Sequence, residues 1–264
     1  MTRLLAIEFR KNLTYVVFWL ILGLHYFFII SIISNINNFA GGMNISTDQY
    51  PDLNLGLVPM FRFPDIWQNI SYLAGFFKIL PGIFIVISVT NEFQFNTVRL
   101  NIVSGLTRLE FILSKVLLIL VISLFSLIVL FTLGMWLGFS HSDMALPIHF
   151  LPGMDFLLGY FIEIFLYMVL ALVISVMLKR TGISILFLLI YPLLIEPLIR
   201  WQTPDYIDRF FPVKSMDQIN VFPFPKYFGY EVQGHIPLDT TIIAIGWIFI
   251  MIYLSYFILK KKDL

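Results

Sequence analysis

Six apolar runs, each of about 20 residues, constrain the fold of this chain more than any other feature. A helix needs roughly 20 apolar residues to cross the hydrocarbon core of a bilayer, because each residue advances it by about 1.5 Å. The runs cover residues 13–34, 69–90, 109–139, 155–178, 183–199 and 239–259. The hydrophobic share of 59% and the mean hydropathy of +0.89 also exceed those of soluble proteins. The sequence therefore predicts an all-α, polytopic membrane protein with six transmembrane helices in one domain, residues 1–264.

Lysine and arginine are distributed unevenly between the two sides of this predicted bundle. Eleven of the 17 lie at the chain ends, between the second and third runs, and between the fourth and fifth. Five lie in the two long segments on the opposite side, and Lys78 lies inside a run. Because short loops rich in these residues stay in the cytoplasm, both termini are predicted to be cytoplasmic. We expect a multi-pass protein of the bacterial cytoplasmic (inner) membrane.

Two flanking segments have their own patterns. Residues 1–12 mix basic and apolar side chains, which favours a helix at the cytoplasmic headgroup layer. A simple extension of the first span is the alternative. Residues 200–238, on the outer side, are dense in aromatic residues and proline, which indicates half-buried helices or loops at the interface, or an aromatic belt.

The polar block at residues 91–115 has the pattern of a short helix that ends and is followed by the start of a second helix. Its apolar residues Phe95, Val98, Ile102 and Leu106 recur every three or four positions, as on one face of a helix. The helix would stop at Gly105, and the pattern Thr-x-x-Glu of a capping box follows at once in residues 107–110. A helix between two spans is well placed to receive force from a soluble partner; an ordinary loop helix is the alternative.

Ionisable residues inside the runs are His25, Lys78 and Glu163, at similar depths below the outer edge. Charges at such depths usually face the bundle interior, a partner or water. The spacing suggests an ion pair between Lys78 and Glu163 with His25 nearby. This group would either line a translocation path or lock the packing of the spans.

Proline and glycine mark places where the spans can bend or approach one another. Pro81 and Gly82 predict a kink in the second span, and Pro192 and Pro197 predict one near the outer end of the fifth. Such kinks suit a moving gate, although prolines also serve packing in membrane helices. A G-x-x-x-G pattern at residues 134–138 permits close helix packing, either within the chain or between copies.

Several chemistries find no support in the sequence. The chain has no cysteine, no phosphate-binding loop, no H-E-x-x-H pattern and no G-x-S-x-G pattern. It is therefore predicted not to be catalytic and to hold no cofactor, and we expect no nucleic-acid partner. His141, Asp143, His149 and Asp155 cluster near one outer connection, but their spacing does not favour a metal site, and no metal is predicted.

The polar block resembles a segment found in permeases of type-2 ABC exporters. The resemblance is carried by Glu92, Thr97, Gly105, Arg108 and Lys115, together with the six spans, the basic N-terminal helix and the long outer segment before the last span. It departs from many members in lacking a proline near Gly105.

This resemblance implies a permease subunit of an ATP-driven exporter. It implies a coupling helix at residues 91–108, a re-entrant outer segment at 200–238, and a separate ATPase subunit that carries ATP and Mg. It also implies a pair of permeases, a homodimer rather than a heterodimer. Glu92 and Arg108 would contact the ATPase, Phe95 and Val98 would supply apolar docking area, and Thr97 belongs to the same coupling group.

Two other classes of function stay open. A gradient-driven secondary transporter would need a coupling site, for which the sequence offers only His25, Lys78 and Glu163. A membrane anchor or assembly subunit would need no transport path. The long outer loops do not follow the inverted repeat that many secondary transporters show.

Overall fold

The computed structural model describes residues 2–41, 44–47, 50–54, 59–142, 151–228 and 231–261, and these are almost entirely helical. Six of the described helical segments are long and apolar enough to cross a membrane. Four of them lie in single helices: α2 (Val16–Gly41), α6 (Arg108–His141), α8 (Asp155–Leu178) and α13 (Leu238–Lys261). The prediction of an all-α, multi-pass membrane protein with six spans is confirmed.

The second and fifth spans are interrupted helices. The second joins α3 (Ile66–Gly75), the 3-10 turn η2 (Phe76–Lys78) and α4 (Ile79–Gln94). The fifth joins α9 (Thr181–Ile190), the π-helical turn η3 (Tyr191–Ile195) and α10 (Glu196–Trp201). Both interruptions lie close to the prolines at which the sequence predicts kinks.

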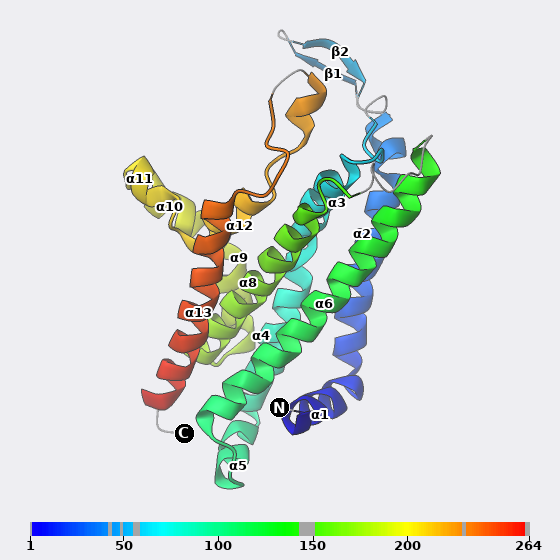
Figure 1. Cartoon of the computed structure of the whole chain (residues 1–264). Coiled ribbons are helices and arrows are strands. Elements are labelled where there is room, and N and C mark those ends of the chain that lie inside the picture. The colour runs from blue at the N-terminus through cyan, green and yellow to red at the C-terminus, as the bar shows by residue number, and fades with distance from the viewer. Residues whose placement is uncertain are drawn as a thin grey trace.

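Helix α8 is the centre of the bundle. It packs against α3, α4, α6, α9 and α13, and Figure 1 shows it enclosed by these elements. Of its most apolar stretch 78% is buried, against 22% for α13 and 17% for the fifth span. The fifth and sixth spans therefore turn most of their apolar surface outward, as membrane-facing helices do.

The two ends of the bundle carry different elements (Figure 1). Helix α1 (Thr2–Leu13), helix α5 (Thr97–Val103) and the C-terminal end of α13 lie at one end. The chain turns at Thr14 and Tyr15, so α1 is a separate helix and not an extension of α2. At the opposite end, β1 (Asn44–Thr47) and β2 (Tyr50–Asn54) form an antiparallel hairpin that the sequence did not predict.

The segment before the last span contains α11 (Asp205–Asp208), α12 (Pro212–Ile219) and the 3-10 turn η4 (Phe224–Phe228). Helix α12 packs against α8 and α13 and buries Val213, Met216 and Ile219. The carboxylate of Glu196 accepts hydrogen bonds from the first backbone N–H groups of α12, at Val213 (3.0 Å) and Lys214 (2.8 Å). These donors have no partner within the helix, so Glu196 anchors α12 to the end of the fifth span.

The G-x-x-x-G pattern of α6 serves packing inside the chain. A side chain at Gly134 would come within 2.6 Å of Trp67 and Ile70 on α3, and one at Gly138 would collide with the ring of Phe63. Both glycines therefore allow the second span to lie against α6.

Candidate functional site

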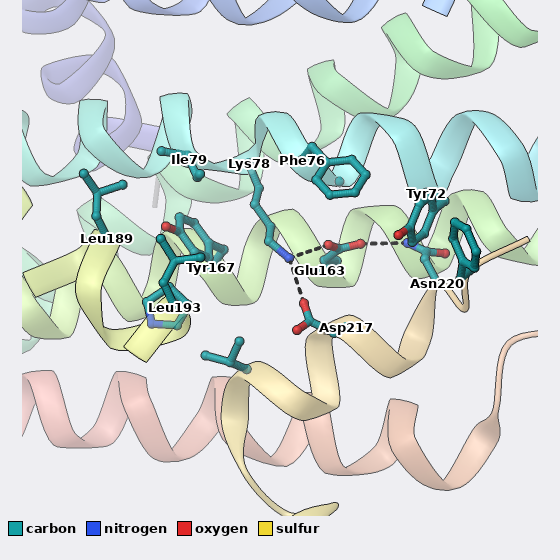
Figure 2. A pocket seen from close by; sticks show the side chains of 14 residues that line it. Tyr72, Phe76, Lys78, Ile79, Glu163, Tyr167, Leu189, Leu193, Asp217 and Asn220 are labelled. Atoms are coloured by element: carbon teal, nitrogen blue, oxygen red, sulfur yellow. Dashed lines mark hydrogen bonds and ion pairs between the residues drawn. The ribbon is translucent and has the colours of Figure 1, made fainter. Parts of the chain in front are cut away.

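A cavity of about 430 Å³ lies between the second span, α8, the fifth span and α12. Figure 2 shows its lining side chains converging from these four elements. It is lined by Tyr72, Gly75, Phe76, Lys78, Ile79, Glu163, Tyr167, Leu189, Pro192, Leu193, Val213, Asp217, Asn220 and Phe222. Its size falls within the usual range of small-molecule sites, roughly 300–1,000 Å³.

Lys78 and Glu163 form the predicted ion pair on the wall of this cavity. The Nζ atom of Lys78 lies 2.6 Å from Oε1 of Glu163 and 3.3 Å from Oδ1 of Asp217 (Figure 2). The Nδ2 group of Asn220 donates to the other oxygen of Glu163 at 2.8 Å. Gly75 makes room for this carboxylate, because a side chain there would lie 2.8 Å from Oε1.

Asp217 and Asn220 are site residues that sequence reasoning missed. They come from α12 and from the residue that follows it. A signal was present: Val213, Met216, Asp217 and Asn220 recur at i, i+3, i+4 and i+7, which places them on one helical face. The face mixes apolar and polar residues, so it did not stand out as amphipathic.

His25 does not join the ion pair. Its Nδ1 atom lies 3.1 Å from the carbonyl oxygen of Phe77, and since a carbonyl only accepts, Nδ1 carries the proton. Pro81 explains this contact, because a residue with an N–H at that position would donate to the carbonyl four residues earlier, that of Phe77. The buried imidazole therefore replaces the donor that proline removes.

The fifth span repeats this arrangement. Pro192 removes the donor for the carbonyl of Leu188, and the hydroxyl of Tyr167 donates to that carbonyl at 3.4 Å. Gly82 allows the approach, because a side chain there would lie 2.7 Å from the Tyr167 ring. Pro197 lies in the first turn of α10, a position where helices tolerate proline. Of the predicted kink residues, Pro192 lines the cavity, and Gly82 lies against Tyr167, which also lines it.

A second polar group, which we name the α1 ion cluster, consists of Glu8, Lys11, Glu92 and Lys115. Lys115 on α6 is fully buried and pairs with Glu8 of α1 and Glu92 of α4. Lys11 also pairs with Glu92, and the Ser114 hydroxyl donates to Glu8 at 3.2 Å. The cluster ties α1 to the ends of the second and third spans that adjoin α5.

The charge of Glu8 depends on this cluster. Burial alone would raise the pKa of its carboxyl, but Lys115 and Lys11 outweigh burial and hold the pKa below its usual value. Glu8 is therefore ionised at neutral pH and provides the carboxylate that Lys115 needs.

The coupling residues expected from the sequence divide into buried and exposed ones. Glu92 and Val98 are 4% and 1% exposed: Glu92 binds two lysines and Val98 packs into the core, so neither side chain lies at the surface of this chain. The hydroxyl of Thr97 donates to the Glu92 carbonyl at 3.1 Å and closes the turn between α4 and α5. Arg108, at the start of α6, donates to the Lys260 carbonyl at 3.0 Å.

The outward face of α5 is apolar and basic. Leu100 and Val103 are 65% and 80% exposed, and Arg99 beside them is exposed too. Phe95, which ends α4 just before α5, is 72% exposed. The stop and restart after α5 follow the prediction: Gly105 has a φ of +100°, and Thr107 and Glu110 form the capping box at the start of α6. The backbone hydrogen bond from Leu106 to the Asn101 carbonyl (3.0 Å) closes the C-terminal end of α5, and the buried Val98 side chain holds its inner face against the core.

The structure describes only part of the group of His and Asp residues at 141–155 that was considered as a metal site. Asp143 and His149 lie outside the described residues. Asp155 accepts a hydrogen bond from the backbone of Ile236 at 2.8 Å and lies 3.4 Å from His235. No group of three His, Cys, Asp or Glu side chains suited to a metal occurs in the part of the chain that the structure describes.

Comparison with known proteins identifies the family but not the activity. No curated protein matches this chain. A family model described as a protein of unknown function, DUF2705, matches residues 45–264, from the β1–β2 hairpin through the last span. The match includes both the cavity and α5, and the chain therefore belongs to the DUF2705 family of membrane proteins.

Proposed function

We propose that this chain is the membrane-spanning permease subunit of an ATP-driven exporter, with ATP and Mg bound by a separate ATPase subunit. The observation that carries the proposal is the outward face of α5, where Phe95, Arg99, Leu100 and Val103 are exposed at the end of the bundle. Exposed apolar side chains beside a basic one are typical of a docking surface for another protein.

The connections of α5 support a role in force transmission. It is continuous with the second span through Asn96 and with the third through Gly105. The α1 ion cluster joins these two spans to α1 at the same end of the bundle. A partner that displaced α5 would therefore move the second span, whose outer part lines the cavity.

The proposal includes an assembly and a location. The weakly buried fifth and sixth spans leave apolar surface for a second copy of the chain, so a homodimer in a bacterial inner membrane fits the fold. Both termini and α5 would lie in the cytoplasm, where ATP is available. The lipid bilayer would cover the remaining apolar surface.

A gradient-driven carrier is the second candidate, because the Lys78–Glu163 pair beside a cavity is an arrangement that ion-coupled transport uses. Such a carrier would transport as an isolated chain under an ion gradient. The permease would require its ATPase.

The first experiment is purification of the tagged chain from its native host, with mass spectrometry of bound proteins and an ATPase assay. We expect a stoichiometric ATP-binding subunit with vanadate-sensitive hydrolysis. The double substitution Arg99→Glu/Leu100→Glu should reduce its recovery by about tenfold or more, since buried contacts in an interface contribute on the order of 1–2 kcal/mol each.

Arg180→Glu is the matched control. Arg180 is an exposed arginine in the turn between α8 and α9, so it receives the same charge reversal away from α5. It should leave recovery of the ATPase unchanged. Purification of a homo-oligomer without any ATP-binding protein, or equal recovery with the α5 variant, would contradict the proposal.

A further inference from the structure

The cavity carries an excess of negative charge. Among the described residues that line it, Lys78 is the one cation and Glu163 and Asp217 are the two carboxylates, so the formal charge of this described lining is −1 at neutral pH. The two carboxylates differ in their surroundings. Glu163 is 6% exposed and held by Lys78 and Asn220, whereas Asp217 is 56% exposed and contacts Lys78 through one oxygen at 3.3 Å.

Aromatic rings line the same cavity as Asp217. Tyr72 packs edge-on against Phe76, with ring centroids 5.2 Å apart, and lies 5.4 Å from the ring of Phe222. Aromatic faces attract organic cations, and the attraction strengthens where water is excluded. The carboxylate and the rings together therefore favour a cation in this cavity.

The mouth of the cavity is apolar. Phe76, Leu193 and Phe222 line it and are 59%, 70% and 50% exposed. Phe76 and Leu193 belong to the second and fifth spans, so this mouth lies on the membrane-spanning part of the molecule. Glu163 stands eight residues, about 12 Å, along α8 from its outer end at Asp155, which places the polar floor below the outer interface. A ligand that enters here needs an apolar body as well as a charged group.

Two other classes of ligand fit less well. An anionic headgroup would have to displace Asp217 from Lys78 and would then lie beside Glu163 as well. A divalent metal ion requires several oxygen, nitrogen or sulfur ligands, and the described residues contain no group of three acidic, histidine or cysteine side chains suited to it. An alkylammonium group needs only one carboxylate and aromatic faces.

We propose that this cavity binds an amphiphile with an ammonium headgroup, which enters sideways from the outer leaflet. The ammonium group pairs with Asp217 and lies against Tyr72, Phe76 and Phe222. The alkyl chain leaves past Leu193 and remains in the lipid. The Lys78–Glu163 ion pair lines the polar end of the cavity and limits how far the headgroup can enter. This binding requires neither ATP nor an ATPase, so it is tested separately from the proposed function.

The test is photo-crosslinking of the purified full chain in nanodiscs of digalactosyldiacylglycerol, a neutral lipid without an ammonium group. The probe is hexadecylammonium with a diazirine in its chain, and hexadecyl phosphate with the same diazirine is the anionic control. Labelled peptides are identified by mass spectrometry. We expect the ammonium probe to label residues 72–79, 189–193 and 213–222, and the phosphate probe to label them about tenfold less.

The substitution Asp217→Asn tests the carboxylate. It leaves the Lys78–Glu163 pair in place, and its thermal unfolding should match that of the unmodified chain. We expect it to reduce labelling of the cavity by about tenfold, the loss of one charge-assisted contact. Asp239→Asn, an exposed acidic residue at the outer end of α13, is the matched control and should change nothing.

Competition identifies the source of the headgroup. If phosphatidylethanolamine in the nanodisc displaces the probe, the ligand is a membrane lipid with an ammonium headgroup. If only added free hexadecylammonium displaces it, the ligand is a free amphiphile. Equal labelling by both probes, unchanged labelling with Asp217→Asn, or labelling that neither compound displaces would overturn the proposal.

Discussion

Lys78 forms its shorter and more buried ion pair with Glu163. Its side chain is 15% exposed, and Glu163, its nearer carboxylate, is 6% exposed. Removal of one member of such a pair leaves a buried charge without compensation, whereas replacement of both members often costs little. The pair therefore makes the stability of the second span depend on α8.

We predict that Lys78→Met lowers the free energy of unfolding by about 3–5 kcal/mol, because Glu163 loses its cation. The double variant Lys78→Met/Glu163→Gln should recover most of this loss, since the glutamine carries no charge and still accepts from Asn220. Thermal and denaturant unfolding in detergent measure both variants. A double variant no more stable than the single one would show that the pair does not set stability.

The sequence indicated the Lys78–Glu163 pair because only three ionisable residues lie deep in the apolar runs and two of them have opposite charge. It did not indicate the separate role of His25. That role depends on which carbonyl Pro81 leaves without a donor and on which helix lies beside it, and the second fact comes only from tertiary packing.

At the scale of elements, the second span is interrupted near Pro81, which cannot donate a backbone hydrogen bond to the Phe77 carbonyl. His25 on α2 supplies that hydrogen bond instead. We predict that His25→Leu destabilises the fold by roughly 1–3 kcal/mol, because the Phe77 carbonyl loses its donor. In a Pro81→Ala background the same change should cost much less, since residue 81 then supplies an N–H. A double-mutant cycle on unfolding midpoints measures this coupling, and strictly additive effects would refute the explanation.

Docking of α1 onto the bundle should depend on pH through Glu8. Because its pKa is lower in the folded chain than in the unfolded one, Glu8 contributes stability above its usual value, near 4.5. That contribution is lost as the pH falls through the folded-state pKa. Unfolding temperatures between pH 7 and pH 3 should therefore fall more steeply for the unmodified chain than for Glu8→Gln. Parallel curves would exclude Glu8 as the cause.

The sequence predicted where α5 stops and where α6 begins, because Gly105, Thr107 and Glu110 determine these points locally. It did not predict which side of α5 faces outward. The Val98 face packs inward, and Glu92 pairs with lysines from α1 and α6 that lie far away in the sequence. Helical periodicity identifies a face but not what covers it.

At the scale of the whole molecule, the distribution of Lys and Arg predicts that α1, α5 and the C-terminus are cytoplasmic. The chain has no cysteine, so single thiols can report orientation without background. A membrane-impermeant maleimide added to intact cells should label Ser140→Cys at the outer end of α6. It should not label Ser104→Cys, beside α5, until the membrane is permeabilised. The reverse pattern would invert the orientation and remove the basis for a cytoplasmic ATPase.

The number and approximate bounds of the spans were predictable because the membrane requires a fixed length of apolar chain. Their arrangement was not. The central position of α8, the hairpin of β1 and β2, and the contribution of α12 to the cavity all depend on contacts between distant segments.

The central position of α8 also determines the order in which the protein can assemble. A ribosome releases the chain from its N-terminus, so three spans enter the membrane before the helix on which most of the bundle packs has been made. During that interval Lys78 is present and Glu163 is not. The first three spans can therefore pack on one another and form the Lys115 ion pairs before residue 163 has been synthesised, but Lys78 gains its buried carboxylate only when α8 enters the bundle.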